Sequence, residues 1–118
     1  MAQDYKELVA WQKGIELVTD IYQATAKFPK EEQYGLTSQL RRASVSVPSN
    51  IAEGQARFSK PDFRHFLRQA RGSVAEVETQ IVISKNLGFL EEKIASSLLR
   101  KAAELGRILN GLIRSIKI

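Results

Sequence analysis

The feature that most constrains the fold is a run of apolar residues whose spacing alternates between four and three positions. The run consists of Phe63, Leu67, Ala70, Val74, Val77 and Ile81. This spacing keeps all of these side chains on one face of an α-helix, whereas a strand would divide them between two faces. The segment is therefore predicted to be a long helix that buries one face against other helices.

Both ends of this helix have residues typical of helix boundaries. Ser59 precedes Pro61 and Asp62, and a capping serine followed by a first-turn proline and an acid is common where helices begin. Gly88 suits the left-handed conformation that closes many helices. A helix from about residue 60 to residue 86 is therefore expected.

Three other segments have apolar stripes at helical spacing. The stripes are Leu8, Trp11, Ile15, Val18 and Ile21; Leu36, Leu40, Ala43, Val47 and Ile51; and Ile94, Leu98, Ala102, Leu105, Leu109, Leu112 and Ile116. Asp4 and Glu7 form a capping pair for the first helix, which runs to about Lys27. Long helices with short connections favour antiparallel neighbours. We therefore predict an all-α, up-down-up-down antiparallel four-helix bundle, with residues 1–118 as a single domain.

The second helix contains two residues that disturb helices. Pro48 cannot donate to the helical ladder and crowds the preceding turn, so we expect a kink there. Gly54 could end the helix, or the helix could continue to Phe58.

Composition argues against enzymatic chemistry. The chain has no cysteine and one histidine, His65, so the common nucleophile and base pairs cannot be assembled within it. No cofactor and no metal site are expected. No apolar run approaches the roughly 20 residues that span a bilayer, and no signal peptide is visible, so the expected compartment is the cytoplasm.

Polar residues accompany the apolar stripes of the second and third helices, at the edge of the expected core. They are Gln39, Arg42, Ser46, Asn50 and Glu53 in the second helix, and Gln69, Ser73, Glu76 and Gln80 in the third. We call this set the polar seam. It is interpreted as a hydrogen-bonded contact between helices or subunits, with Arg42 paired to Glu76 or Glu53, because buried polar groups usually have partners. The alternative is a carboxylate site built from Glu53 and Glu76.

Basic residues gather on two helices. Lys93, Arg100, Arg107 and Arg114 are seven positions apart, which keeps them on one face and spaces them about 10.5 Å along the axis. We call these four residues the basic ladder; Lys101 flanks it. A second cluster consists of Arg64, Arg68 and Arg71 on the third helix. Both clusters are candidate phosphate-binding sites. The alternatives are a solvated face, or salt bridges between subunits with Glu104 as one partner.

Apolar residues beyond the main stripe of the fourth helix bear on assembly. Leu99, Ile108 and Ile113 exceed what one stripe of this helix can bury, so they predict a homo-oligomer.

The chain shows no RNA-stacking motif that can be recognised among its aromatic residues Tyr34, Phe58, Phe63 and Phe66. Packing in the core is the better explanation for them.

Several motifs resemble those of the bacterial 23S rRNA intervening-sequence proteins. They are Leu8-x-x-Trp11, Phe28-Pro29, Glu32, the segment from Gly35 to Ala43, Ser46-Val47-Pro48-Ser49-Asn50-Ile51-Ala52-Glu53-Gly54, and Ala70-x-Gly72-Ser73-x-x-Glu76. The resemblance implies a four-helix bundle that often assembles as a homopentamer, without established enzymatic activity. Some relatives are encoded within large-subunit ribosomal RNA genes. Others resemble accessory proteins of diversity-generating retroelements, which contact a reverse transcriptase and nucleic acid.

Two functions therefore compete. The leading hypothesis is a non-enzymatic bundle that contacts the phosphates of RNA or DNA. The alternative is an oligomeric scaffold or reverse-transcriptase accessory protein, in which the basic faces meet an acidic protein partner.

Overall fold

The computed structural model describes residues 4–118, which contain four α-helices and no strand. Residues 1–3 of the predicted domain lie outside the described residues. Helix α1 spans Val9–Thr25, α2 spans Leu36–Ala56, α3 spans Lys60–Asn86 and α4 spans Glu92–Ser115. Short 3-10 turns occur at Tyr5–Glu7 (η1) and Lys30–Glu32 (η2). The predicted all-α class and four-helix count are confirmed.

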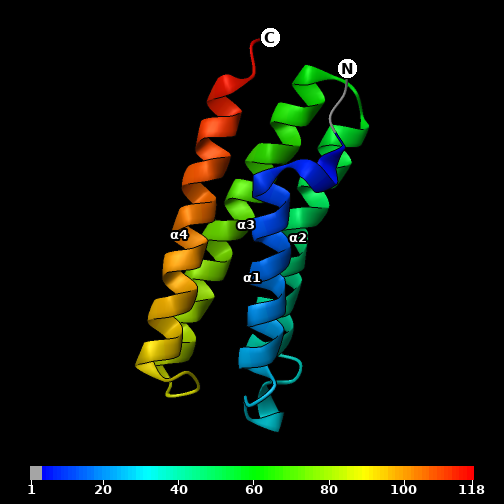
Figure 1. Ribbon diagram of the computed structural model, residues 1–118. Helices are drawn as coiled ribbons and strands as arrows, with labels where there is room; N and C mark the ends of the chain where they lie inside the picture. The colour runs from blue at the N-terminus through cyan, green and yellow to red at the C-terminus, as the bar shows by residue number, and fades with distance from the viewer. Residues whose placement is uncertain (1–3) are drawn as a thin grey trace.

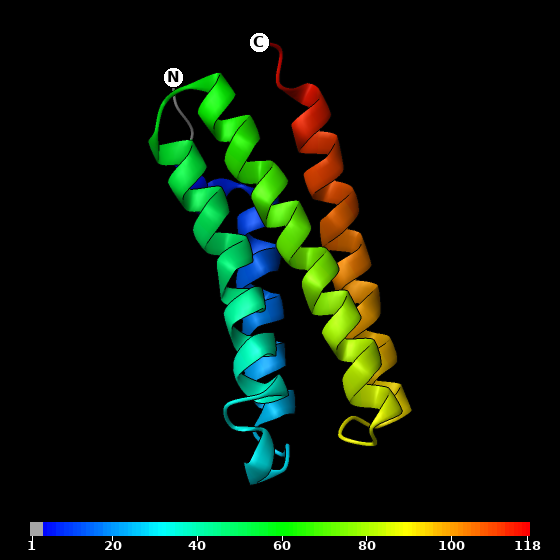
Figure 2. The same ribbon diagram turned by 180° about the vertical axis from the view of Figure 1, so that it is seen from behind.

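Consecutive helices run in opposite directions along the long axis of the molecule (Figure 1). Each helix packs on the next one in the chain, and α4 also packs on α1. Within the described residues, no Cα atom of α2 lies within 8 Å of one of α4, so these two helices are not direct neighbours. The reverse view shows α3 in front, between α2 and α4 (Figure 2). One edge of α4 therefore borders α1 and the other borders α3.

The core contains most residues of the predicted stripes, but Ile15 and Ile94 are 41% and 40% exposed. In α1 the predicted face was largely wrong, because Ala10, Gly14 and Leu17 are buried there beside Ile21. Leu67, Ala70, Val74, Val77 and Ile81 of α3 are completely buried, while Phe63 packs against the core from its edge. Ile21, Leu40, Ile51 and Leu109 supply buried side chains from the other helices. Each such side chain stabilises the fold by about 1.5–3 kcal/mol relative to an exposed one. The heptad-like spacing thus identified the buried face of α3.

Helix boundaries follow local signals in most places. The side chain of Ser59 accepts a hydrogen bond from the amide of Asp62, and Gly88 has φ of 82°. The capping pair of Asp4 and Glu7 exists, but it caps η1 rather than the first α-helix, which begins only at Val9.

Helix α2 continues unbroken through Pro48 and Gly54. The proline ring packs on Gly14 of α1, where a Cβ atom would lie 3.3 Å from the Cβ of Pro48. A Cβ at Gly54 would lie 2.7 Å from that of Phe66 on α3. Gly54 therefore permits close packing of α2 on α3 and does not end the helix. The kink at Pro48 stays a prediction.

Candidate nucleic-acid interface

The basic ladder lies on the outer surface of α4. Lys93, Arg100, Arg107 and Arg114 are all exposed, and Leu98, Leu105 and Leu109 occupy the buried side of the same helix. Within the described residues, none of the four cations forms an ion pair. Their charges are therefore available to a ligand.

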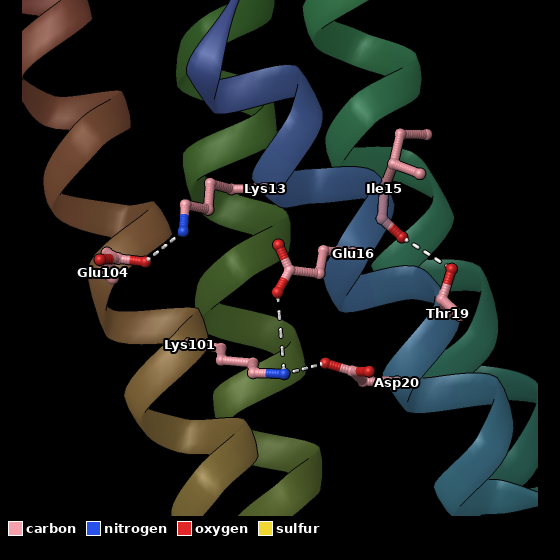
Figure 3. A network of polar contacts seen from close by, with 7 residues as sticks. All are labelled: Lys13, Ile15, Glu16, Thr19, Asp20, Lys101 and Glu104. Carbon is pink, nitrogen blue, oxygen red and sulfur yellow. Dashed lines mark hydrogen bonds and ion pairs between the residues drawn. The ribbon is translucent and has the colours of Figure 1, made fainter.

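Lys101 differs from the four ladder residues because it forms ion pairs with acidic side chains of α1. Its Nζ lies 2.5 Å from an oxygen of Asp20 and 3.9 Å from one of Glu16 (Figure 3). The hydrogen bond to Asp20 raises the pKa of Lys101, against a smaller opposing effect of burial. The sequence grouped Lys101 with the ladder, whereas the structure places it in an ion-pair network between α1 and α4.

Glu104 belongs to the same network. Its carboxylate lies 3.3 Å from Nζ of Lys13 on α1 (Figure 3). The sequence offered Glu104 as a partner for cations of another subunit. Within the chain it is already paired, so the network neutralises the α1 side of α4 and leaves the ladder uncompensated.

The second basic cluster adjoins the ladder. Nε of Arg71 on α3 donates a hydrogen bond to Oδ1 of Asn110 on α4 at 3.2 Å. Asn110 lies about one turn from Arg107 and from Arg114. Arg68 is exposed, whereas Arg64 is half-buried and its buried Nε has no hydrogen-bond partner among the described residues. The two clusters, predicted separately, therefore form one surface.

This surface contains the entire net charge of the protein. Residues 63–75 and 105–118 include six cations and no acid, while the remainder has twelve cations and thirteen acids. Both segments lie at the same end of the bundle (Figure 1). We call this set the basic end: Arg64, Arg68, Arg71, Arg107, Arg114 and Lys117. A field from one sign of charge attracts polyanions and raises their association rate.

The polar seam is joined at two points between α2 and α3. The hydroxyl oxygens of Ser46 and Ser73 lie 2.6 Å apart, and Nε2 of Gln80 donates to Oε1 of Gln39 at 3.4 Å. The amide of Asn50 bonds within α2, to the carbonyl of Ser46 at 2.8 Å. The side chain of Gln69 bonds within α3, to His65 at 3.1 Å.

Within the described residues of one chain, Arg42 pairs with neither Glu76 nor Glu53, and its pairing across a subunit contact stays a prediction. Glu53 pairs instead with Arg57, four residues later in α2, at 2.9 Å. Arg42 and Glu76 are exposed and line a groove of about 500 Å³ without forming an ion pair in residues 4–118. In the same part of the chain, no group of three or more acidic or histidine side chains could hold a metal ion. Glu53 does not line the groove that Glu76 borders, and a carboxylate site built from the two stays a prediction.

Two aromatic residues assigned to the core are on the surface. Tyr34 is 90% exposed and Phe58 is 79% exposed. Both lie in connections between helices, where the helical periodicity that locates core residues no longer applies. Phe66 is half-buried, with the guanidinium of Arg57 over its ring at 5.1 Å.

The surplus apolar residues of α4 also differ from expectation. Leu99, Ile108 and Ile113 pack against the core as partly buried residues. They therefore supply less exposed apolar surface than the sequence suggested, and the homo-oligomer stays a prediction. Exposed apolar side chains lie elsewhere, including Val82, Ile83 and Leu87 on and after α3.

Sequence reasoning missed the role of Arg41. Its Nε donates to Oγ1 of Thr25 at 2.9 Å, and its guanidinium lies 4.4 Å from the ring centroid of Tyr22. Both partners lie in the last turns of α1, so this arginine fixes α2 against the end of α1. No sequence signal separates Arg41 from Arg42, because neither has a partner nearby in the chain.

The part of the chain that the structure describes has no helix both long and apolar enough to cross a membrane.

The fold and this surface define the class as an all-α, four-helix protein with a strongly polarised charge distribution. A family model described as "23S rRNA-intervening sequence protein" matches residues 6–111. The chain therefore belongs to the 23S rRNA-intervening sequence protein family.

A solved structure supports the fold assignment. It is a crystal structure of a protein with unknown function from the S23 ribosomal protein family of Bacteroides thetaiotaomicron. It superposes with a TM-score of 0.81 at 20% identity, covering 91% of this chain and 100% of that chain. At this identity the likeness shows the fold alone. The comparison with curated proteins gives no match.

Proposed function

We propose that this protein binds RNA or DNA without catalysing a reaction, through phosphate contacts at the basic end and along the basic ladder. The observation that supports the proposal is the separation of charge: six cations and no acid in two adjoining segments, in a chain whose remainder is close to neutral.

The spacing of the cations suits an extended polyanion. Residues of the ladder recur about every 10.5 Å, so the ladder is about 30 Å long and can contact several phosphates. Arg68 adds a contact on the outer side of α3. Phosphate contacts of this kind release counterions, and binding therefore weakens steeply with salt.

The test is the salt dependence of binding to a short labelled RNA and a DNA of the same sequence, measured by fluorescence anisotropy. The proposal expects the logarithm of the association constant to fall linearly with the logarithm of salt concentration. Its slope should correspond to several phosphates, at roughly 0.7–0.9 per contact. Absence of binding at low salt would contradict it.

We also propose self-association, for which the resemblance favours a pentamer, and the outer face of α3 is the surface that supports it. Gly72, Ala75, Thr79 and Ile83 of α3 border a shallow groove that is also lined by Gln39, Gln80 and Glu76. Ile83 is 41% exposed there, and exposed apolar side chains of this kind are common at protein interfaces. Light scattering tests this: wild type should exceed the monomer mass, and Ala75→Arg should reduce it.

If an acidic partner such as a reverse transcriptase is the true ligand, the basic end should bind that protein and not nucleic acid.

A further inference from the structure

Phe58 has an unusual backbone and an unusual environment. It follows the last turn of α2 and has φ of 52°, and it is the sole non-glycine residue with positive φ among residues 4–118. This region is sterically unfavourable for bulky side chains. Its ring is nevertheless 79% exposed, so burial does not compensate for the strain. Glycine would fit the backbone better, so the phenylalanine needs another explanation.

The surroundings of Phe58 combine apolar and basic groups. Beside it lies a shallow cavity of about 360 Å³, lined by Gly54, Ser59, Lys60 and Phe63 among others. Lys60 is exposed. Along α3, Arg64 and Arg68 follow within about 12 Å of helix axis from Lys60. The aromatic ring therefore stands beside a flat recess at the same end of the molecule as the basic end.

We propose that Phe58 is a stacking platform for an unpaired nucleobase, so that the protein selects single-stranded over duplex nucleic acid. This inference rests on the proposed nucleic-acid binding and specifies its substrate class. An exposed aromatic face next to a basic track is how proteins hold single strands without reading sequence. In a duplex the bases are already stacked, so their faces are not available to Phe58.

The alternative role for Phe58 is structural, as a contact between subunits. The two roles differ in the response to glycine. If Phe58 binds a base, Phe58→Gly removes backbone strain and raises the melting temperature while it weakens single-strand binding. If Phe58 packs in an interface, the same change lowers the melting temperature or the oligomeric mass.

The test uses a single-stranded RNA of about twelve nucleotides containing one 2-aminopurine, and a duplex RNA of the same length. Phe58→Leu removes the aromatic face and keeps an apolar side chain in the turn. Tyr34→Leu is the control, because Tyr34 is 90% exposed in the connection before α2, at the other end of the bundle.

Wild type should bind the single strand more tightly than the duplex and quench the 2-aminopurine. Phe58→Leu and Phe58→Gly should lose about 5- to 100-fold in single-strand affinity together with the quenching, with duplex binding unchanged. Tyr34→Leu should behave as wild type. The inference is overturned if both Phe58 variants bind the single strand as wild type does, or if Phe58→Gly lowers the melting temperature. If wild type binds the single strand and the duplex equally well, and the Phe58 variants have the same affinities as wild type, only this inference is overturned and the proposed function stands. Failure of wild type to bind either RNA removes the proposed function as well.

Discussion

Arg71 on α3 donates a hydrogen bond from Nε to Oδ1 of Asn110 on α4 at 3.2 Å, between the turns that hold Arg107 and Arg114. This contact joins α3 to α4 where two groups of arginines meet in one surface. A Cβ at Gly106 would lie 3.2 Å from Cζ of Arg71, so the arginine also packs closely on α4. Arg71 therefore contributes both to the packing of α3 on α4 and to the positive charge of the basic end.

The first prediction separates these two roles of the arginines. Arg71→Met should lower the free energy of unfolding by about 1 kcal/mol, because it removes a partly buried hydrogen bond. Arg68→Met should leave the free energy of unfolding within about 0.5 kcal/mol of wild type, because Arg68 is exposed. Urea denaturation measures both. If the two variants lose equal stability, Arg71 has no special structural role.

The second prediction concerns Gly54. Gly54→Ala should destabilise the protein by about 1–3 kcal/mol, because the added Cβ would lie 2.7 Å from the Cβ of Phe66. Gly111 is a matched control, since it lies inside α4 with no atom within 4 Å of an added Cβ. Gly111→Ala should stabilise the protein by up to about 1 kcal/mol through helix propensity. Thermal melts that rank the two variants in the opposite order would contradict this packing.

The third prediction is a pH effect at Lys101. Its folded-state pKa is raised by the bond to Asp20, so the bonded lysine stabilises the protein fully below the ordinary pKa of 10.5. That stabilisation is lost as pH rises through the folded-state pKa. Because Lys101 is 43% exposed, Lys101→Met should cost under about 1 kcal/mol at pH 7. Denaturation at neutral pH and above pH 10.5 should show the difference between variant and wild type shrinking at high pH. A constant difference would indicate that packing of the lysine stem, not its charge, is responsible.

The fourth prediction follows from the unpaired state of Arg42 and Glu76. A double-mutant cycle with Arg42→Ala and Glu76→Ala should give a coupling energy below about 0.5 kcal/mol in the monomer. The same cycle for Glu53 and Arg57, which are paired at 2.9 Å, is the positive control and should give a few tenths of a kcal/mol. A large coupling between Arg42 and Glu76 would mean that the two side chains pair in solution.

The sequence predicted features that depend on residues close together in the chain, but not contacts between residues that are far apart in it. The buried face of α3 and the roles of Ser59 and Gly88 follow from neighbours three or four residues apart, so periodicity and capping rules found them. Partner choices across helices did not follow. Lys101 was grouped with the ladder because its actual partner, Asp20, is 81 positions away in the chain. The pairing of Arg42 likewise depended on how α2 faces α3. Rotation of one helix against another is decided by packing, which a single sequence does not display.

The exposure of Phe58 was missed for a related reason. Hydrophobicity and its place near an apolar stripe suggested core packing, but α2 ends at Ala56 and the chain turns in a left-handed conformation there. Phenylalanine is uncommon at such positions, so no composition rule anticipates it. The joining of the two basic clusters was likewise visible only once α3 and α4 were placed side by side.

The most direct test of the account is a matched pair of charge reversals. Arg68→Glu with Arg107→Glu alters the basic surface, and Lys27→Glu with Lys30→Glu makes the same change in net charge at exposed sites at the other end of the bundle. RNA affinity is measured for both by fluorescence anisotropy at low salt, after circular dichroism has established that each remains folded. The account predicts at least about a tenfold loss for the first variant, or about 1.4 kcal/mol, and a much smaller loss for the second. Equal losses in the two variants would show that overall charge, and not the basic surface of α3 and α4, governs binding.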